Sequence, residues 1–249
     1  MERACAVLSA FSAAEPRLGL RELAERVGLP RATVHRLAGS LVAAGFMEHG
    51  DDGRYALGLR MSELGALVRS DLDVVTTCSP AVDALAAATG ETVLLGAVDW
   101  GTLELTVVGT RVSPHTLSVI PMAGRRQAIP PGCLGKALLS ALPAAELDDV
   151  LAGLPLPALT PKTHTDRAEL RSEIALARKL GFAIAEEEYI EGVSGVAVPV
   201  MFQQARPRAA IGVVGPSSRI SSELEEIGRL VVELTSTLRP AQPLAEAVA

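Results

Sequence analysis

The chain has 249 residues, of which 49% are hydrophobic and 3% aromatic, and its formal net charge is −6. This length favours two domains, with cores built mainly from Ala, Val and Leu. The acidic total argues against a protein that coats nucleic acids nonspecifically, but the first 60 residues carry eight arginines against seven acids, so a local basic patch stays compatible with DNA binding.

Three short helices are predicted near the start of the chain. The first covers residues 3–13 and packs its apolar side on the next two. The second runs from Leu20 to Val27 with apolar residues at helical spacing, and Gly28 turns the chain after it. Pro30 suits the first turn of the third helix, whose apolar residues are Val34, Leu37 and Leu41. Two such helices must cross and share one small core, as in a helix-turn-helix.

The outward face of the third helix is polar, which is the layout of a recognition helix in the major groove. Arg36 is the candidate for reading a base, through a bidentate contact with guanine, and its alternative role is a phosphate clamp. Arg31 and Thr33 at the helix start are expected to position phosphates. His35 either contacts a base edge or is solvated, and Ser40 completes the face.

A β-hairpin is predicted directly after this helix. Residues 46–48 and 54–57 flank residues 49–53, whose Asp-Gly step is a strong signal for a tight turn. Arg54 lies beside the turn, where it can reach a phosphate or the minor groove. The alternative is an ordinary helical hairpin with solvated arginines, but turn glycine, core spacing and hairpin together favour a winged helix-turn-helix.

Residues 59–68 form another helical pattern without an obvious local partner, which is typical of a linker helix that also makes a dimer contact. We therefore expect a DNA-binding domain over residues 1–58, a linker helix over 59–75 and a second domain over 76–249.

The second domain is expected to be α+β, because β-rich runs alternate with helical patterns. A helix is predicted from Ala81 to Thr89, opened by Ser79-Pro80 and ended by Gly90. The other predicted helices cover 134–142, 146–151, 167–180 and 222–238. The predicted strands cover 92–98, 103–108, 116–119, 183–187, 195–200 and 209–214.

The remaining chemical motifs give weak signals. Gly132 to Lys136 reads GxxGK with Ala137 following, which departs from a phosphate-binding loop, so Lys136 is expected to cap or pair locally. The acidic run 186–188 is interpreted as a solvated strand end, because adjacent residues on a strand point to opposite faces. Trp100, at a hairpin tip, is either a surface anchor for a partner subunit or an exposed turn residue.

Three cysteines and four histidines are scattered without metal-ligand spacing, so no disulfide framework, metal or cofactor is expected, and a reducing cytoplasm is the simplest location. Cys133 is expected to be a packing residue, because nothing nearby in sequence would lower its pKa. No secretory signal and no run long enough to span a bilayer is recognised.

Several ordered motifs resemble the IclR family of bacterial transcription regulators. The block from Thr33 to Gly65 resembles the recognition helix, GF step, GRY wing and LGxRxxxLG linker of that family. Residues 134–139 resemble its LGKALLA helix, and residues 187–193 resemble its EExxxGV segment. The resemblance covers essentially the whole chain. It implies a GAF-like second domain that binds a small effector, assembly as dimers or dimers of dimers, and effector-dependent DNA occupancy.

This sequence departs from the family at the positions that line the effector pocket. The corresponding residues are Cys133, Leu134, Ala185, Gly195, Gly212 and Val214, and they lack most of the polar groups that hold a small oxo-acid. Such a site offers few hydrogen bonds to replace the water that a carboxylate loses on binding. We therefore expect an effector larger or more apolar than a two- or three-carbon acid, and the alternative is a pocket that has lost ligand binding.

The sequence thus predicts a homo-oligomeric regulator that binds a double-stranded operator and responds to a small-molecule effector, with no membrane partner. One alternative is an enzyme fused to a DNA-recruiting domain, although no catalytic triad, metal or cofactor pattern can be placed. The other is a constitutive DNA-binding oligomer with an empty pocket.

Overall fold

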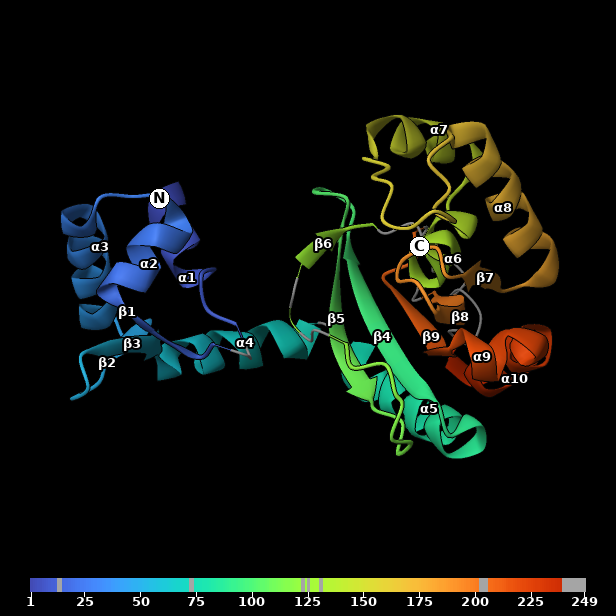
Figure 1. Ribbon diagram of the computed structural model, residues 1–249, viewed down its shortest axis with the longest axis horizontal. Helices are drawn as coiled ribbons and strands as arrows, with labels where there is room; N and C mark the ends of the chain where they lie inside the picture. Colours follow the sequence, from blue (N-terminus) through green and yellow to red (C-terminus); the bar gives the residue numbers. More distant parts are fainter. Residues whose placement is uncertain are drawn as a thin grey trace, which may run out of the picture. The chain divides into compact units, whose positions relative to one another are not determined.

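The computed structural model describes residues 1–12, 15–71, 74–121, 124, 126–129, 132–201 and 206–238. The chain divides into two compact units, residues 1–73 and 74–249, each with its own core. The helix expected as a separate linker belongs to the first unit by this division. Figure 1 labels the elements along the chain.

The first unit contains the predicted helix-turn-helix. Its first three helices are α1 (Glu2–Leu8), α2 (Leu20–Val27) and α3 (Arg31–Ala43). Gly28 ends α2 with a φ of 65°, a left-handed conformation that a side chain would strain, and Pro30 is the N-cap of α3 rather than part of its first turn. The shared core is formed by buried residues that include Val7, Leu23, Ala24, Val34, Ala38, Met47 and Tyr55.

Helix α1 is shorter than the predicted 3–13. It ends with Ser9 as its C-cap, and the carbonyl of Ala10 accepts a hydrogen bond of 2.9 Å from the Arg26 side chain. Residues 13 and 14 lie outside the described residues.

The predicted wing is present as β2 (Met47–His49) paired antiparallel with β3 (Arg54–Leu57). A third strand, β1 (Arg17–Gly19), pairs with the other edge of β3, so the sheet order is β1-β3-β2. This strand was not predicted, because three residues are too few to show the alternation of apolar and polar side chains that identifies a strand. It anchors the start of α2 to the wing.

Helix α4 (Leu59–Asp71) follows the wing; it extends three residues past the helical pattern of 59–68 and ends before the end of the expected linker over 59–75. Its start is fixed by Gly58, whose backbone N–H donates to the Phe46 carbonyl at 2.9 Å, and by the Arg60 guanidinium, which lies 5.8 Å from the Phe46 ring centroid.

We expect Gly58→Ala to destabilise the first unit by about 2 kcal/mol, because the added Cβ would lie 2.3 Å from the Gly45 carbonyl oxygen and must displace backbone. Gly39→Ala in α3 is the matched control, since nothing lies within 4 Å of its Cβ and alanine favours a helix. Thermal unfolding followed by circular dichroism measures both. Equal unfolding temperatures for the two variants would contradict the close approach of Gly58 to the Gly45 carbonyl.

The second unit is built on a six-stranded antiparallel sheet in the order β6-β5-β4-β9-β8-β7. Long central strands bring the two ends of the unit's sequence together, because β4 pairs with β9 from Thr92↔Val214 to Ala97↔Ala209. The strands are β4 (Thr92–Asp99), β5 (Glu104–Arg111), β6 (Arg126–Ala128), β7 (Ala183–Glu186), β8 (Val193–Val200) and β9 (Ala209–Pro216).

Helices cover both faces of this sheet, which confirms the α+β class (Figure 1). One face packs on α6, and α8 packs on α6 in turn; the other face packs on α5 and α10. The helices are α5 (Val74–Thr89), α6 (Cys133–Ser140), α7 (Ala144–Gly153), α8 (Arg167–Leu180), α9 (Ser217–Ile220) and α10 (Leu224–Thr235), with short 3-10 turns at 221–223 and 236–238. Every helix within the described ranges is too short or too polar to span a lipid bilayer.

Three predictions for the second unit are corrected, and one strand was not predicted. Residues 116–119 are not a strand: they lie in a loop held to β4 by the Thr92 hydroxyl, which donates to the Val119 carbonyl at 2.9 Å. Helix α5 begins at Val74 and contains Pro80, which was expected to open it. Strand β6 was missed. The closing helix α10 covers Leu224–Thr235 instead of 222–238, and a 3-10 turn lies at each of its ends.

Candidate functional site

The predicted DNA-reading residues lie on two elements of the first unit. On α3, the side chains of Arg31, His35, Arg36 and Ser40 are exposed and Thr33 is half-buried, whereas Val34 and Ala38 face the core. The Ser40 hydroxyl donates to the Arg36 carbonyl at 3.1 Å. Within the described residues neither Arg31 nor Arg36 has a carboxylate partner, so both guanidinium groups are available to an incoming phosphate or base.

Arg54 is placed differently, at the start of β3 directly after the turn of the wing. Its guanidinium lies 3.8 Å from the Glu22 carboxylate and donates to the Arg17 carbonyl at 3.4 Å. Its backbone N–H donates to the Asp52 carboxylate at 3.1 Å, and this bond lowers the pKa of Asp52. A DNA contact by Arg54 therefore competes with local partners that are themselves exposed and weakly bound.

The second unit contains a cavity of about 430 Å³ at the start of α6. Five of the six residues expected at an effector pocket line it, namely Cys133, Leu134, Ala185, Gly195 and Val214. Most of the other walls are apolar and come from the sheet and from the segments before β6, α8 and β8. They include Leu94, Val107, Val119, Ile120, Leu159, Tyr189, Ile190 and Val193.

Gly212, the sixth residue, does not line this cavity. It lies on β9 under α6, where an added Cβ would be 3.1 Å from the Leu134 side chain and 3.0 Å from the Val196 carbonyl. Gly212 therefore lets the helix approach the sheet. Gly195 has a similar role on β8, since its Cβ would lie 3.3 Å from the Cys133 sulfur.

A buried ion-pair network lies beside the cavity and was not predicted. The Lys136 ammonium, 1% exposed, is 2.6 Å from Glu188 Oε1 and 2.9 Å from Glu173 Oε2. Glu188, itself 5% exposed, lines the cavity. The expectation of a solvated acidic strand end is therefore wrong for Glu188, because β7 ends at Glu186 and the next residues turn inward.

The turn that carries Glu188 is held by hydroxyl groups from another loop. Glu187 adopts a φ of 59°, which is unusual for a residue with a side chain. The Thr160 hydroxyl donates to the Glu187 carbonyl at 2.7 Å, and the Thr163 hydroxyl donates to the Glu188 carbonyl at 2.6 Å. These bonds fix the direction in which the Glu188 side chain enters the protein.

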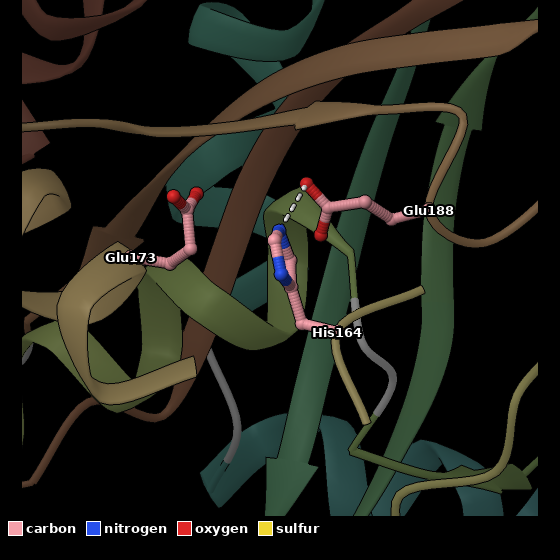
Figure 2. Close-up of side chains that lie close together, drawn as sticks. All are labelled: His164, Glu173 and Glu188. Atoms are coloured by element: carbon pink, nitrogen blue, oxygen red, sulfur yellow. Dashed lines mark ion pairs between the residues drawn. The ribbon is translucent and has the colours of Figure 1, made fainter. Parts of the chain in front are cut away.

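His164, Glu173 and Glu188 present ligand atoms within 4.8 Å of one another, as a metal site would require (Figure 2). Figure 2 shows the His164 ring beside the Glu188 carboxylate, with 3.8 Å between Nε2 and Oε1. However, the Lys136 ammonium already pairs with both carboxylates of this group. A divalent ion would have to displace a buried cation that the chain itself supplies, so the donor set does not fit a metal.

Trp100 is a structural residue rather than a surface anchor. Its side chain is half-buried against two core clusters of the second unit, and its indole N–H donates to the Pro207 carbonyl at 2.7 Å.

We expect the thiol of Cys133 to be unreactive in the folded protein, because burial raises its pKa to about 12 and leaves almost no thiolate at neutral pH. Burial also raises the pKa of Cys78 to about 11, whereas Cys5 is exposed and serves as the control. Iodoacetamide at pH 8, followed by peptide mass spectrometry, should label Cys5 alone until denaturant is added. Rapid native labelling of Cys133 would contradict its placement.

Two family models match the chain. Residues 1–50 match the IclR helix-turn-helix domain, and residues 66–239 match the C-terminal domain of the bacterial transcriptional regulator IclR. The glycerol operon regulatory protein of Streptomyces griseus is 33% identical over 244 residues, which are 96% of this chain and 91% of that one. The regulator XynR of Escherichia coli is 30% identical over 222 residues, which are 88% and 87%.

A solved structure of the same family is similar to the whole chain. The crystal structure of an IclR homologue complexed with 4-hydroxybenzoate, from Microbacterium hydrocarbonoxydans, superposes with a TM-score of 0.79 at 27% identity. The match covers 96% of this chain and 98% of that one.

Proposed function

The chain belongs to the IclR family of bacterial DNA-binding transcription regulators, and from this premise we propose that a small molecule bound in the cavity of the second unit changes the affinity of the first unit for a specific operator. The observation that carries the proposal is the cavity of about 430 Å³ at the start of α6, which has the size and the largely apolar walls of a ligand site. Such an effector acts through its differential affinity for two states of the protein.

On the DNA side, we propose that Arg36 reads a base while Arg31 and Thr33 position phosphates at the start of α3. His35 and Ser40 extend the same face, and Arg54 adds a contact from the wing. The exposure of the α3 side chains and the lack of carboxylate partners for the two α3 arginines within the described residues support this assignment. Two such readers in a homo-oligomer would bind a roughly palindromic operator in the cytoplasm.

On the effector side, we propose a ligand that is larger or more apolar than a two- or three-carbon oxo-acid. The apolar walls contributed by Leu134, Ala185 and Val214 support it, since they offer no hydrogen-bonding side chain to a carboxylate. The homologue crystallised with 4-hydroxybenzoate, a ring compound larger than a three-carbon acid, is consistent with this proposal. Tight calorimetric binding of pyruvate or glyoxylate would contradict the proposal.

The test measures the affinity of the full chain for fragments of its own upstream promoter by fluorescence anisotropy, with and without aromatic and aliphatic metabolites. A ligand that shifts the affinity supports regulation. Turnover of the same ligand would favour the fused-enzyme alternative, although both family models are those of regulators. Ligand-independent binding across the panel would favour a constitutive DNA-binding oligomer. Sedimentation of the same sample measures its oligomeric state.

A further inference from the structure

The cavity of the second unit has an unusual charge pattern. Among the described residues that line it there is no Arg, Lys or His, and Glu188 carries the only full charge. The Cys133 thiol stays neutral, because burial raises its pKa to about 12. The remaining polar side chains, Gln127, Tyr189 and Ser194, are uncharged, and the Tyr189 hydroxyl already donates to Gln127.

The two carboxylate oxygens of Glu188 have different surroundings. Oε1 accepts a hydrogen bond from the Lys136 ammonium at 2.6 Å. Oε2 is buried and has no hydrogen-bond partner among the described residues. A carboxylate is purely an acceptor, so leaving the buried Oε2 without a donor is unfavourable, and a donor brought next to it would be bound. A molecule in the cavity that Glu188 lines is a source of such a donor.

The network behind Glu188 does not provide a spare positive charge. Lys136 is shared with Glu173 at 2.9 Å, so one ammonium faces two carboxylates. His164 lies between these carboxylates and a third one, at 3.6 Å from Glu169, and adds a positive charge only when it is protonated. With one ammonium facing two carboxylates, this cluster repels an anion and attracts a hydrogen-bond donor or a cation.

We propose that the cavity selects a ligand with an apolar body and a hydrogen-bond-donating end, a hydroxyl or an amine, which pairs with Glu188. A carboxylate at that end is disfavoured, because it would lose its hydration and meet the like charge of Glu188, with no cation among the described residues that line the cavity. This ligand class rests on the proposed function, since it names the chemistry of the effector that the cavity receives. Glu188 is accordingly a specificity-determining residue, held in place by Lys136 and by the Thr160 and Thr163 hydroxyls.

The test uses four ligands that share one ring and one methyl group: 4-methylbenzyl alcohol, 4-methylbenzylamine, 4-methylbenzoate and p-xylene. Calorimetric titration of the full chain at pH 7.5 is expected to show that the alcohol or the amine binds at least about tenfold more tightly than 4-methylbenzoate. The hydrocarbon is expected to bind more weakly than the better of these two, because it leaves Oε2 without a donor.

Two neighbouring substitutions separate a direct role of Glu188 from a general effect on charge. Glu188→Gln keeps the side-chain volume and is expected to reduce the preference over 4-methylbenzoate by about tenfold. Glu187→Gln removes the same charge one residue away, but Glu187 pairs with Lys162 at 3.1 Å and does not line the cavity, so the preference is expected to persist. If Glu188→Gln fails to fold, the ligand series on the unmodified chain tests the preference for a donor by itself.

The proposal is overturned if 4-methylbenzoate binds as tightly as the alcohol and the amine, if none of the four ligands binds, or if Glu187→Gln and the folded Glu188→Gln behave alike. Anisotropy with promoter DNA distinguishes these failures from failure of the proposed function. A carboxylate that binds and shifts DNA affinity overturns the ligand class but leaves regulation intact. An alcohol that binds without shifting DNA affinity supports the ligand class but contradicts the proposed regulation.

Discussion

Arg36→Ala is expected to lower the affinity of the full chain for its operator by roughly 10- to 100-fold, because one bidentate arginine–guanine contact contributes about 1–3 kcal/mol of discrimination. The side chain is exposed on α3, on the side away from Val34 and Ala38, which pack in the core. Since Arg36 contributes nothing to that core, the substitution should leave the unfolding midpoint unchanged. Fluorescence anisotropy with a promoter fragment measures the loss.

The matched control is Arg21→Ala. Arg21 is also exposed but lies on α2, where it pairs with Glu25 at 2.7 Å, so its loss should change operator affinity little.

Two further measurements distinguish base reading by Arg36 from phosphate clamping. Loss of a base contact weakens operator binding much more than binding to random DNA, whereas loss of a phosphate contact weakens both and lowers the salt dependence by about one ion. Equal weakening on both DNAs would refute base reading.

The first unit could be predicted closely because its signals are local. The period from Leu20 to Val27, the turn at Gly28 and the Asp-Gly step of the wing each fix a conformation within a few residues. The errors arose where distant residues decide the outcome. Strand β1 pairs with the free edge of β3, and the carbonyl of Ala10, just after the end of α1, accepts a hydrogen bond from Arg26, which lies 16 residues away.

In the second unit the buried network was the main feature that sequence reasoning missed. Lys136 and Glu188 are 52 residues apart, and the turn that points Glu188 inward depends on two threonine hydroxyls from a third segment. One signal was present in the sequence. Lys136 is the single charged residue in α6, whose other residues apart from Ser140 are apolar or glycine. A lysine in such a helix is buried and requires a carboxylate partner.

Lys136→Met is expected to destabilise the second unit by about 3–5 kcal/mol, because it leaves the buried Glu188 carboxylate without its cation. The melting temperature should fall by about 10 °C or more for a unit of this size. Methionine nearly preserves the side-chain volume, so the loss does not come from a cavity. Lys179→Met on the exposed side of α8 is the control and should have little effect. Scanning calorimetry of the three proteins measures these differences.

The double variant Lys136→Met with Glu188→Gln separates charge burial from packing. If the cost of the single variant is an uncompensated carboxylate, removing that charge as well should recover most of the lost stability, and the two substitutions should be strongly non-additive. Additive losses would mean that Lys136 stabilises α6 through packing alone. Because Glu188 also lines the cavity, the double variant should fold yet lose its preference for a donor ligand, which ties the stability of α6 and the selectivity of the cavity to the same pair of charges.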